Sequence, residues 1–114
     1  MLLSEAAKIL DAEIVCCKDK IDKEVTHACA SDMMSDVLAF ALEYCLLLTG
    51  LVNQQVIRTA EMMDIVCVCF VRDKRPDETI LALAQSKGIV VMCTPHLLFE
   101  SSGRLYMNGL VGKD

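Results

Sequence analysis

Length, composition and charge exclude several classes of protein. The chain has 114 residues, a formal net charge of −5 and 54% hydrophobic residues, and this length fits one domain with its own core. The acidic balance argues against a nucleic-acid-binding protein, which needs a basic face. No apolar run reaches the roughly 18 residues of a membrane span. We therefore expect a single domain over residues 1–114, with neither nucleic acid nor a membrane as partner.

The N-terminus and the cysteines predict a cytoplasmic protein. The first residues, MLLSEAAKIL, lack a basic segment and a cleavage site, so they do not resemble a signal peptide. The seven cysteines are odd in number, form no Cys-x-x-Cys pair and lie mostly in apolar runs. Disulfide frameworks and zinc sites need other spacings, so we expect reduced, buried thiols and no metal or cofactor. These cysteines are Cys16, Cys17, Cys29, Cys45, Cys67, Cys69 and Cys93.

In chain order, the first half predicts a helix, two strands and a second helix. Residues 4–10 form a short helix with Ser4 as N-cap. Residues 12–17 and 24–30 are predicted strands, separated by the charged loop KDKIDK. A second helix is expected to follow over the segment SDMMSDVLAFALEY, opened by Ser31 or Asp32.

The second half has a regular rhythm of strands and helices. Short apolar runs predict strands at residues 45–50, 64–71 and 89–93. Helical spacing of apolar residues over 53–63, and acids followed by Lys87 and Gly88 in 77–88, predict the two intervening helices. Thr94 and Pro95 are the predicted N-cap and first residue of a last helix that ends near Asn108.

This order of elements predicts the fold class. Connections of about a dozen residues between strands imply parallel pairing. Strands that are apolar throughout imply a sheet covered on both faces. We expect an α/β fold of three layers, α/β/α, around a mainly parallel central sheet.

In such sheets, ligands bind beyond the carboxyl ends of the strands. Thr49 and Gly50, leading to Asn53, place backbone N–H groups at a helix start that could hold an anion. The alternative is a tight turn with an ordinary cap. Arg72 and Lys74 belong to the basic run RDKRP, which either attracts a phosphate or is simply solvated. The predicted ligand-binding residues are Thr49, Gly50, Asn53, Arg72, Lys74, Thr94 and His96.

No residue predicts catalysis. His27 lies in an apolar strand without a carboxylate at regular spacing, and packing explains it. A Cys93–His96 pair would be an activated thiolate, but Cys93 ends a buried strand. The methionine pairs and the acidic residues of the helix after Ser31 are typical of core filling and of a solvated face. We therefore predict that the chain is not an enzyme.

Nearly the whole chain, from about Met1 to Leu110, resembles the free-standing form of the DRTGG domain family. The order and spacing of segments carry the resemblance. They are MLLSEAAKILDAEIV, ASDMMSDVLAF, LLLTGLVNQQVIRTAEMM and VCVCFVRDKRPDETILALAQSKGIVVMCTPHLLFESSGRLY.

The resemblance implies a fold similar to the N-terminal domain of HPr kinase/phosphorylase and the N-terminal domains of Mur ligases. It also implies a role. Relatives inside phosphotransacetylases and between the CBS domains of regulated pyrophosphatases look like non-catalytic regulatory or dimerising modules. Free-standing copies resemble proteins encoded near iron-only hydrogenase components, which implies a redox partner.

Three hypotheses about function follow. The first is a non-catalytic regulatory or interaction module, forming a homodimer and docking to a metabolic or redox enzyme. The second is a sensor that binds a nucleotide or another phosphorylated metabolite at the strand ends. The third is an enzyme or electron-transfer protein that uses cysteines.

Overall fold

Helices and strands alternate along the chain in the computed structural model, which describes residues 1–112. The helices are α1 (Leu3–Ile9), α2 (Met34–Phe40), α3 (Gln54–Met62), α4 (Glu78–Lys87) and α5 (Leu98–Met107), with a 3₁₀ turn at Lys18–Lys20. The strands are β1 (Glu13–Cys16), β2 (His27–Ala30), β3 (Cys45–Thr49), β4 (Cys67–Phe70) and β5 (Val90–Cys93). The mixed α/β class predicted from the sequence is therefore confirmed.

The strands form one sheet in the order β1-β5-β4-β3-β2. Strands β2, β3, β4 and β5 pair in parallel with their neighbours, while β1 joins the edge beside β5 in the antiparallel direction. The outer edge of β2 is partly covered, because Val111 bridges His27 and its carbonyl accepts the Ala28 N–H at 2.9 Å.

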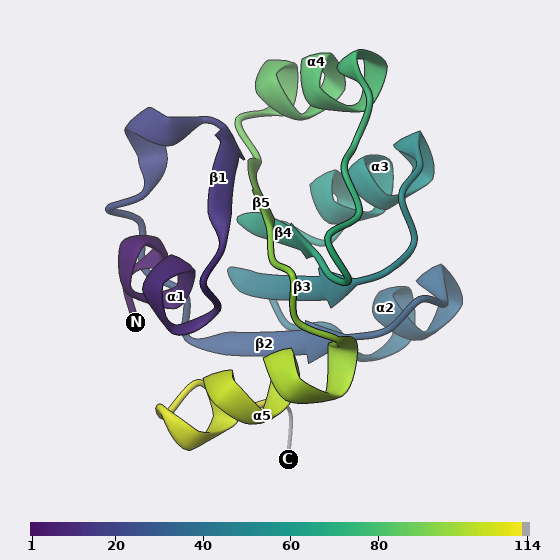
Figure 1. Ribbon diagram of the computed structural model, residues 1–114. Coiled ribbons are helices and arrows are strands. Elements are labelled where there is room, and N and C mark those ends of the chain that lie inside the picture. Colours follow the sequence, from purple (N-terminus) through teal and green to yellow (C-terminus); the bar gives the residue numbers. More distant parts are fainter. Residues whose placement is uncertain (113–114) are drawn as a thin grey trace.

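Helices lie on both faces of this sheet (Figure 1). The parallel strands follow each other in space as in sequence, and right-handed crossovers then place α2, α3 and α4 on one face. The other face is covered by α5, which contacts β2 and β3, and by α1, which contacts α5. The carboxyl ends of the parallel strands thus open at one edge, next to the starts of the helices.

The core is centred on the three inner strands, where every residue of β3, β4 and β5 is buried. Side chains on both faces of these strands are covered by helices, which is why their sequences are apolar without alternation. Phe70 and Leu47 are both 0% exposed. The strands at the two edges, β1 and β2, are only partly buried.

Some helix ends agree with the sequence signals. Asn53 caps α3, because its Oδ1 accepts the Val56 N–H at 3.1 Å, and Asp77 does the same for Ile80 at 2.9 Å at the start of α4. Gly88 ends α4 in a left-handed conformation, with φ 68°, as a helix-ending glycine does.

Other predicted helix ends were wrong. Ser4 lies inside α1, whose first turn is closed instead by the Glu5 carboxylate accepting the Leu2 N–H at 3.1 Å. The second helix starts after Met33, not at Ser31 or Asp32, and ends at Phe40. Both of those polar side chains are used elsewhere: the Ser31 hydroxyl accepts the Met33 N–H, and Asp32 binds the loop after β3.

The start of the last helix was also misplaced. Helix α5 begins at Leu98 after Leu97, so Thr94 is not its N-cap and Pro95 is not its first residue. The Thr94 hydroxyl is fully buried and donates to the Leu10 carbonyl at 2.5 Å. This hydrogen bond connects the end of β5 to the end of α1.

Candidate functional site

The loops after β3, β4 and β5 are hydrogen-bonded to one another at the carboxyl edge of the sheet. The Val71 N–H donates to the Thr49 carbonyl at 3.0 Å. On the other side, the Arg72 N–H donates to the His96 carbonyl at 2.9 Å and the Asp73 N–H to the Thr94 carbonyl at 2.8 Å. The β4 loop therefore lies between the other two, and its backbone position is fixed by both.

The turn after β3 is held by a carboxylate that the sequence analysis assigned only as a candidate helix N-cap. Asp32, just after β2, accepts the Thr49 hydroxyl at 3.1 Å and the Gly50 N–H at 2.6 Å through the same Oδ1 atom. The Thr49 hydroxyl also accepts the Leu51 N–H at 3.1 Å. The turn does bind an anionic group, as its N–H groups predict, but that group is part of the chain.

Arg72 lies directly against the backbone of Gly50. A Cβ added at Gly50 would come within 2.7 Å of Arg72 Nη2 and 3.3 Å of Nε, so a side chain there would displace the guanidinium. Arg72 and Asp73 both have left-handed backbones, with φ 60° and 57°, which non-glycine residues rarely adopt. The two hydrogen bonds to the β5 loop hold this conformation and direct the Arg72 side chain over Gly50.

The remaining predicted residues divide into two groups. Asn53 is next to this turn, but its side-chain oxygen is used as the cap of α3. Lys74 is exposed in the same loop as Arg72. His96 instead directs its Nε2 to Asp11 Oδ2 at 2.9 Å, and Arg104 Nη1 lies 3.4 Å from the same oxygen.

Asp11, in the α1–β1 turn, is therefore the centre of a separate polar cluster with His96, before the start of α5, and Arg104, in its last turn. The His96 hydrogen bond is the main cause that lowers the pKa of the Asp11 carboxyl; burial opposes it, and the positive charge of Arg104 adds to the lowering. Nothing in the local sequence links these residues, which are 85 and 93 positions apart from Asp11. Only the fold brings them together.

The thiols show no sign of activation. Burial raises the pKa of Cys93, with Arg75 opposing the shift in part, and the His96 ring is turned to Asp11. Burial also raises the pKa of Cys45 to about 11. Within residues 1–112, no three side chains of the metal-binding types gather in one place. None of the helices in that range is long and apolar enough to cross a membrane.

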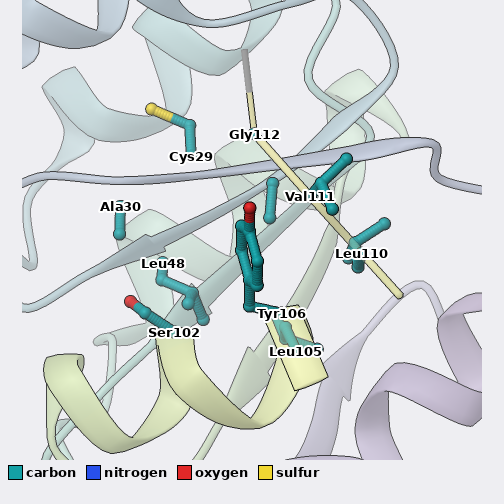
Figure 2. Close-up of a pocket in the computed structure, with 10 residues that line it drawn as sticks. Cys29, Ala30, Leu48, Ser102, Leu105, Tyr106, Leu110, Val111 and Gly112 are labelled. Carbon is teal, nitrogen blue, oxygen red and sulfur yellow. The ribbon is translucent and has the colours of Figure 1, made fainter. Parts of the chain in front are cut away.

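Two hollows in the surface of the described residues are lined by residues outside this loop cluster. One, of about 180 Å³, lies between β2, α5 and residues 110–112. Figure 2 shows the ring of Tyr106 rising from α5 toward β2, with Leu48 and Ala30 on one side and Leu110 and Val111 on the other. The sequence interpretation missed this apolar pocket, because its residues come from four separate segments: β2, β3, α5 and residues 110–112.

A second hollow, of about 230 Å³, lies at the end of the strands opposite to the loop cluster. Its wall includes Lys87 and Glu61, which form an ion pair with Nζ 2.9 Å from Oε2. Both partners are partly exposed, so this pair contributes little to stability.

Comparisons with known proteins give an informative match among solved structures. The sequence matches no protein-family model and no curated protein. Among solved structures, the chain is similar to the CBS and DRTGG domains of the regulatory region of Clostridium perfringens pyrophosphatase, a crystal structure containing the activator diadenosine tetraphosphate. The identity is 19%, the TM-score is 0.73, and the match covers 96% of this chain and 47% of that chain. At this identity the likeness shows a related fold, and this chain spans about half the length of its neighbour.

Proposed function

We propose that this chain is a single-domain regulatory module without catalytic activity of its own. In this proposal it belongs to the DRTGG family, with the fold of the HPr kinase and Mur ligase N-terminal domains, and works in the cytoplasm. It forms a homodimer and docks to a metabolic or hydrogenase-related enzyme. The observation that carries the proposal is the fold, which is similar over 96% of the chain to the regulatory region of a pyrophosphatase.

A second candidate function, sensing of a nucleotide or phosphorylated metabolite, is favoured by the turn after β3. Here the Gly50 N–H and the Thr49 hydroxyl already hold a carboxylate, and the Arg72 guanidinium lies against the same glycine. Donors of this kind bind phosphate as well as carboxylate. The structurally similar regulatory region of the pyrophosphatase binds diadenosine tetraphosphate. We propose that this chain senses a ligand of the same kind.

The sensing mechanism that we propose is exchange of one anion for another. An incoming phosphate takes the Gly50 N–H and Thr49 hydroxyl from Asp32 and pairs with Arg72. Lys74 adds positive charge, Asn53 orders the start of α3, and Thr94 and His96 keep the Arg72 backbone in place. The released Asp32 precedes α2, whose Phe40 side chain is 60% exposed. Ligand binding would therefore shift the position of α2, whose exposed surface a partner enzyme can contact.

The test is thermal unfolding of the reduced protein with adenine and guanine nucleotides, diadenosine tetraphosphate, acetyl phosphate and pyrophosphate. A ligand that binds only the folded state raises the melting temperature in a saturable way. Arg72→Ala is expected to weaken binding by about tenfold or more, the value of a hydrogen bond to a charged group. Asp32→Asn is expected to strengthen it, because the neutral amide competes less well with phosphate. Chromatography after incubation should recover the ligand unchanged.

Arg75→Ala is the matched control. It removes the same side chain from the same loop, but Arg75 Nη1 is paired with Glu13 at 2.8 Å instead of lying on Gly50. If no compound shifts the melting temperature, or if Arg72→Ala and Arg75→Ala behave alike, ligand sensing at this turn is wrong. Turnover of any ligand would contradict the non-catalytic role itself.

A further inference from the structure

The outward face of α5 carries a strip of exposed apolar side chains. Phe99 is 85% exposed, Tyr106 66% and Met107 89%. At 3.6 residues per turn, these three and Gly103 fall within an arc of about 100°, opposite the buried Ser101 and Leu105. Apart from the backbone of α5 itself, no atom of residues 1–112 lies within 4 Å of the Cβ position of Gly103, so the centre of the strip is open to close approach.

The strip adjoins the apolar pocket beside β2. Tyr106 belongs to both, and Ser102 lines the pocket from the same side of α5. The pocket volume of about 180 Å³ suits a single aromatic ring, since an apolar cavity of roughly 150 Å³ is enough to bind benzene. Helix α5 therefore presents the projecting ring of Phe99 and, at Tyr106, a pocket that can hold a ring. The two are seven residues apart, or about 10 Å along the helix axis.

We propose that this surface binds a second copy of the same chain, with the two α5 helices antiparallel about a two-fold axis at Gly103. Phe99 and Met107 stand four residues before and after Gly103, so the strip maps onto itself under this symmetry. Projection of the helix places Phe99 of each copy beside Tyr106 and the pocket mouth of the other. In a two-fold interface each such contact occurs twice.

Charge complementarity favours a second copy as the occupant. Glu100 and Arg104 lie on the same flank of the strip, and the two-fold axis places Glu100 of one copy next to Arg104 of the other. Arg104 Nη1 already donates to the Ile9 carbonyl at 3.1 Å and lies 3.4 Å from Asp11 Oδ2. The guanidinium has five N–H groups, so its other groups can donate to a further partner. The apolar contacts are thus flanked by two Glu100–Arg104 pairs. The axis also brings the two Arg104 side chains near each other, and Asp11 of each copy, 3.4 Å from its own Arg104, offsets their charge.

The size of the surface predicts a weak dimer. A stable interface buries about 800 Å² on each partner, and one helix face with an adjoining pocket is smaller. We therefore expect dissociation in the micromolar range. The inference rests on the homodimer of the proposed function and names its interface. It uses none of the residues proposed for ligand binding.

Sedimentation velocity over a series of concentrations spanning the micromolar range tests the interface. The wild-type protein should move toward twice the mass of one chain as concentration rises. Phe99→Glu should weaken the dimer at least tenfold, because it places a charge in an apolar contact. Phe40→Glu is the matched control: it makes the same change at a 60% exposed phenylalanine on the opposite face of the sheet. Equal melting temperatures of the two variants would show that both fold.

Gly103→Cys tests the symmetry independently. A residue on the two-fold axis meets its own copy, so this variant should form a disulfide-linked dimer under mild oxidation, and Phe40→Cys should not. If Phe99→Glu leaves the dimer intact while Phe40→Glu dissolves it, α5 is the wrong surface and the homodimer stands. If the wild-type protein stays monomeric throughout, both the interface and the homodimer of the proposed function are wrong, whatever the ligand experiment shows.

Discussion

Two aspartates from outside the predicted site organise the carboxyl edge of the sheet. Asp32 holds the turn after β3 through Thr49 and Gly50, and Asp11 holds His96 from the α1–β1 turn. Asp11 has a left-handed backbone, with φ 51°, which directs its carboxylate toward α5. Asp32 accepts hydrogen bonds from the Gly50 N–H and the Thr49 hydroxyl, and Asp11 pairs with the His96 ring. From the sequence alone, these donors look available to a ligand.

The first prediction at this scale concerns acid stability. The pKa of Asp11 is lowered from 3.8 in the folded protein, first by the His96 hydrogen bond. Its stabilising contribution is therefore present above about pH 4 and is lost as the pH falls through the folded pKa. Asp11→Asn should lower the urea midpoint at pH 7 and flatten its decline between pH 5 and pH 2. Asp22→Asn, at another exposed aspartate, should change neither; equal curves for all three proteins would contradict the role of Asp11.

The helix ends fall into two groups, according to the kind of interaction that determines where each helix begins or ends. Asn53, Asp77 and Gly88 act through their own side chain or lack of one, within the helix that they cap. Helices α1, α2 and α5 begin after Leu2, Met33 and Leu97, and no side chain of these residues caps the helix. At the start of α1, the Glu5 carboxylate accepts the Leu2 N–H and the distant Lys23 carbonyl accepts the Leu3 N–H. A search for a capping side chain at the residue before the helix therefore does not mark these starts.

Asn53 is the residue where a structural and a ligand-binding role can be separated. Asn53→Ala should lower the free energy of unfolding by about 1 kcal/mol, since it removes the acceptor for the Val56 N–H. Asn53→Asp keeps an acceptor and should retain most of the stability. Chemical denaturation measures both variants. A loss below about 0.3 kcal/mol in Asn53→Ala would show that the side chain is not needed as a cap.

Across the whole molecule, six of the seven cysteines are buried, and Cys29 is partly exposed. Cys45, Cys67 and Cys69 are 0% exposed, on the inner strands β3 and β4. Burial raises the pKa of Cys45 to about 11 and that of Cys16, with an adjacent Cys17 thiol, to about 12. Thiols kept neutral in this way react slowly as nucleophiles.

Alkaline stability follows from the same burial. In the unfolded chain these thiols ionise near their usual pKa of 9.0, and in the folded protein only at higher pH. Between about pH 9 and pH 11 the unfolded state thus binds fewer protons, and stability falls as the pH rises. Urea midpoints measured from pH 7.5 to pH 11 should decline, and Cys45→Ala should decline less steeply. Parallel curves for the two proteins would mean that Cys45 ionises equally in both states.

The sequence determined the elements that depend on short-range information. Continuous apolar runs located β3, β4 and β5, and the caps Asn53 and Gly88 located the ends of α3 and α4, because period, burial and capping act over a few residues. Of the predicted ligand residues, the fold brings Thr49, Gly50 and Arg72 together at one turn, as expected for loops at the same edge of a parallel sheet. Their use by a ligand stays a prediction.

Only the tertiary structure decided what those residues touch. The Asp32 contact with Gly50 spans 18 residues, and the His96 contact with Asp11 spans 85. The antiparallel placement of β1 beside β5 and the pocket between β2 and α5 likewise join segments from opposite ends of the chain. Such contacts are selected by the packing of complete elements, which no local pattern encodes. The sequence therefore specified which residues end at the edge of the sheet, and the fold specified their partners.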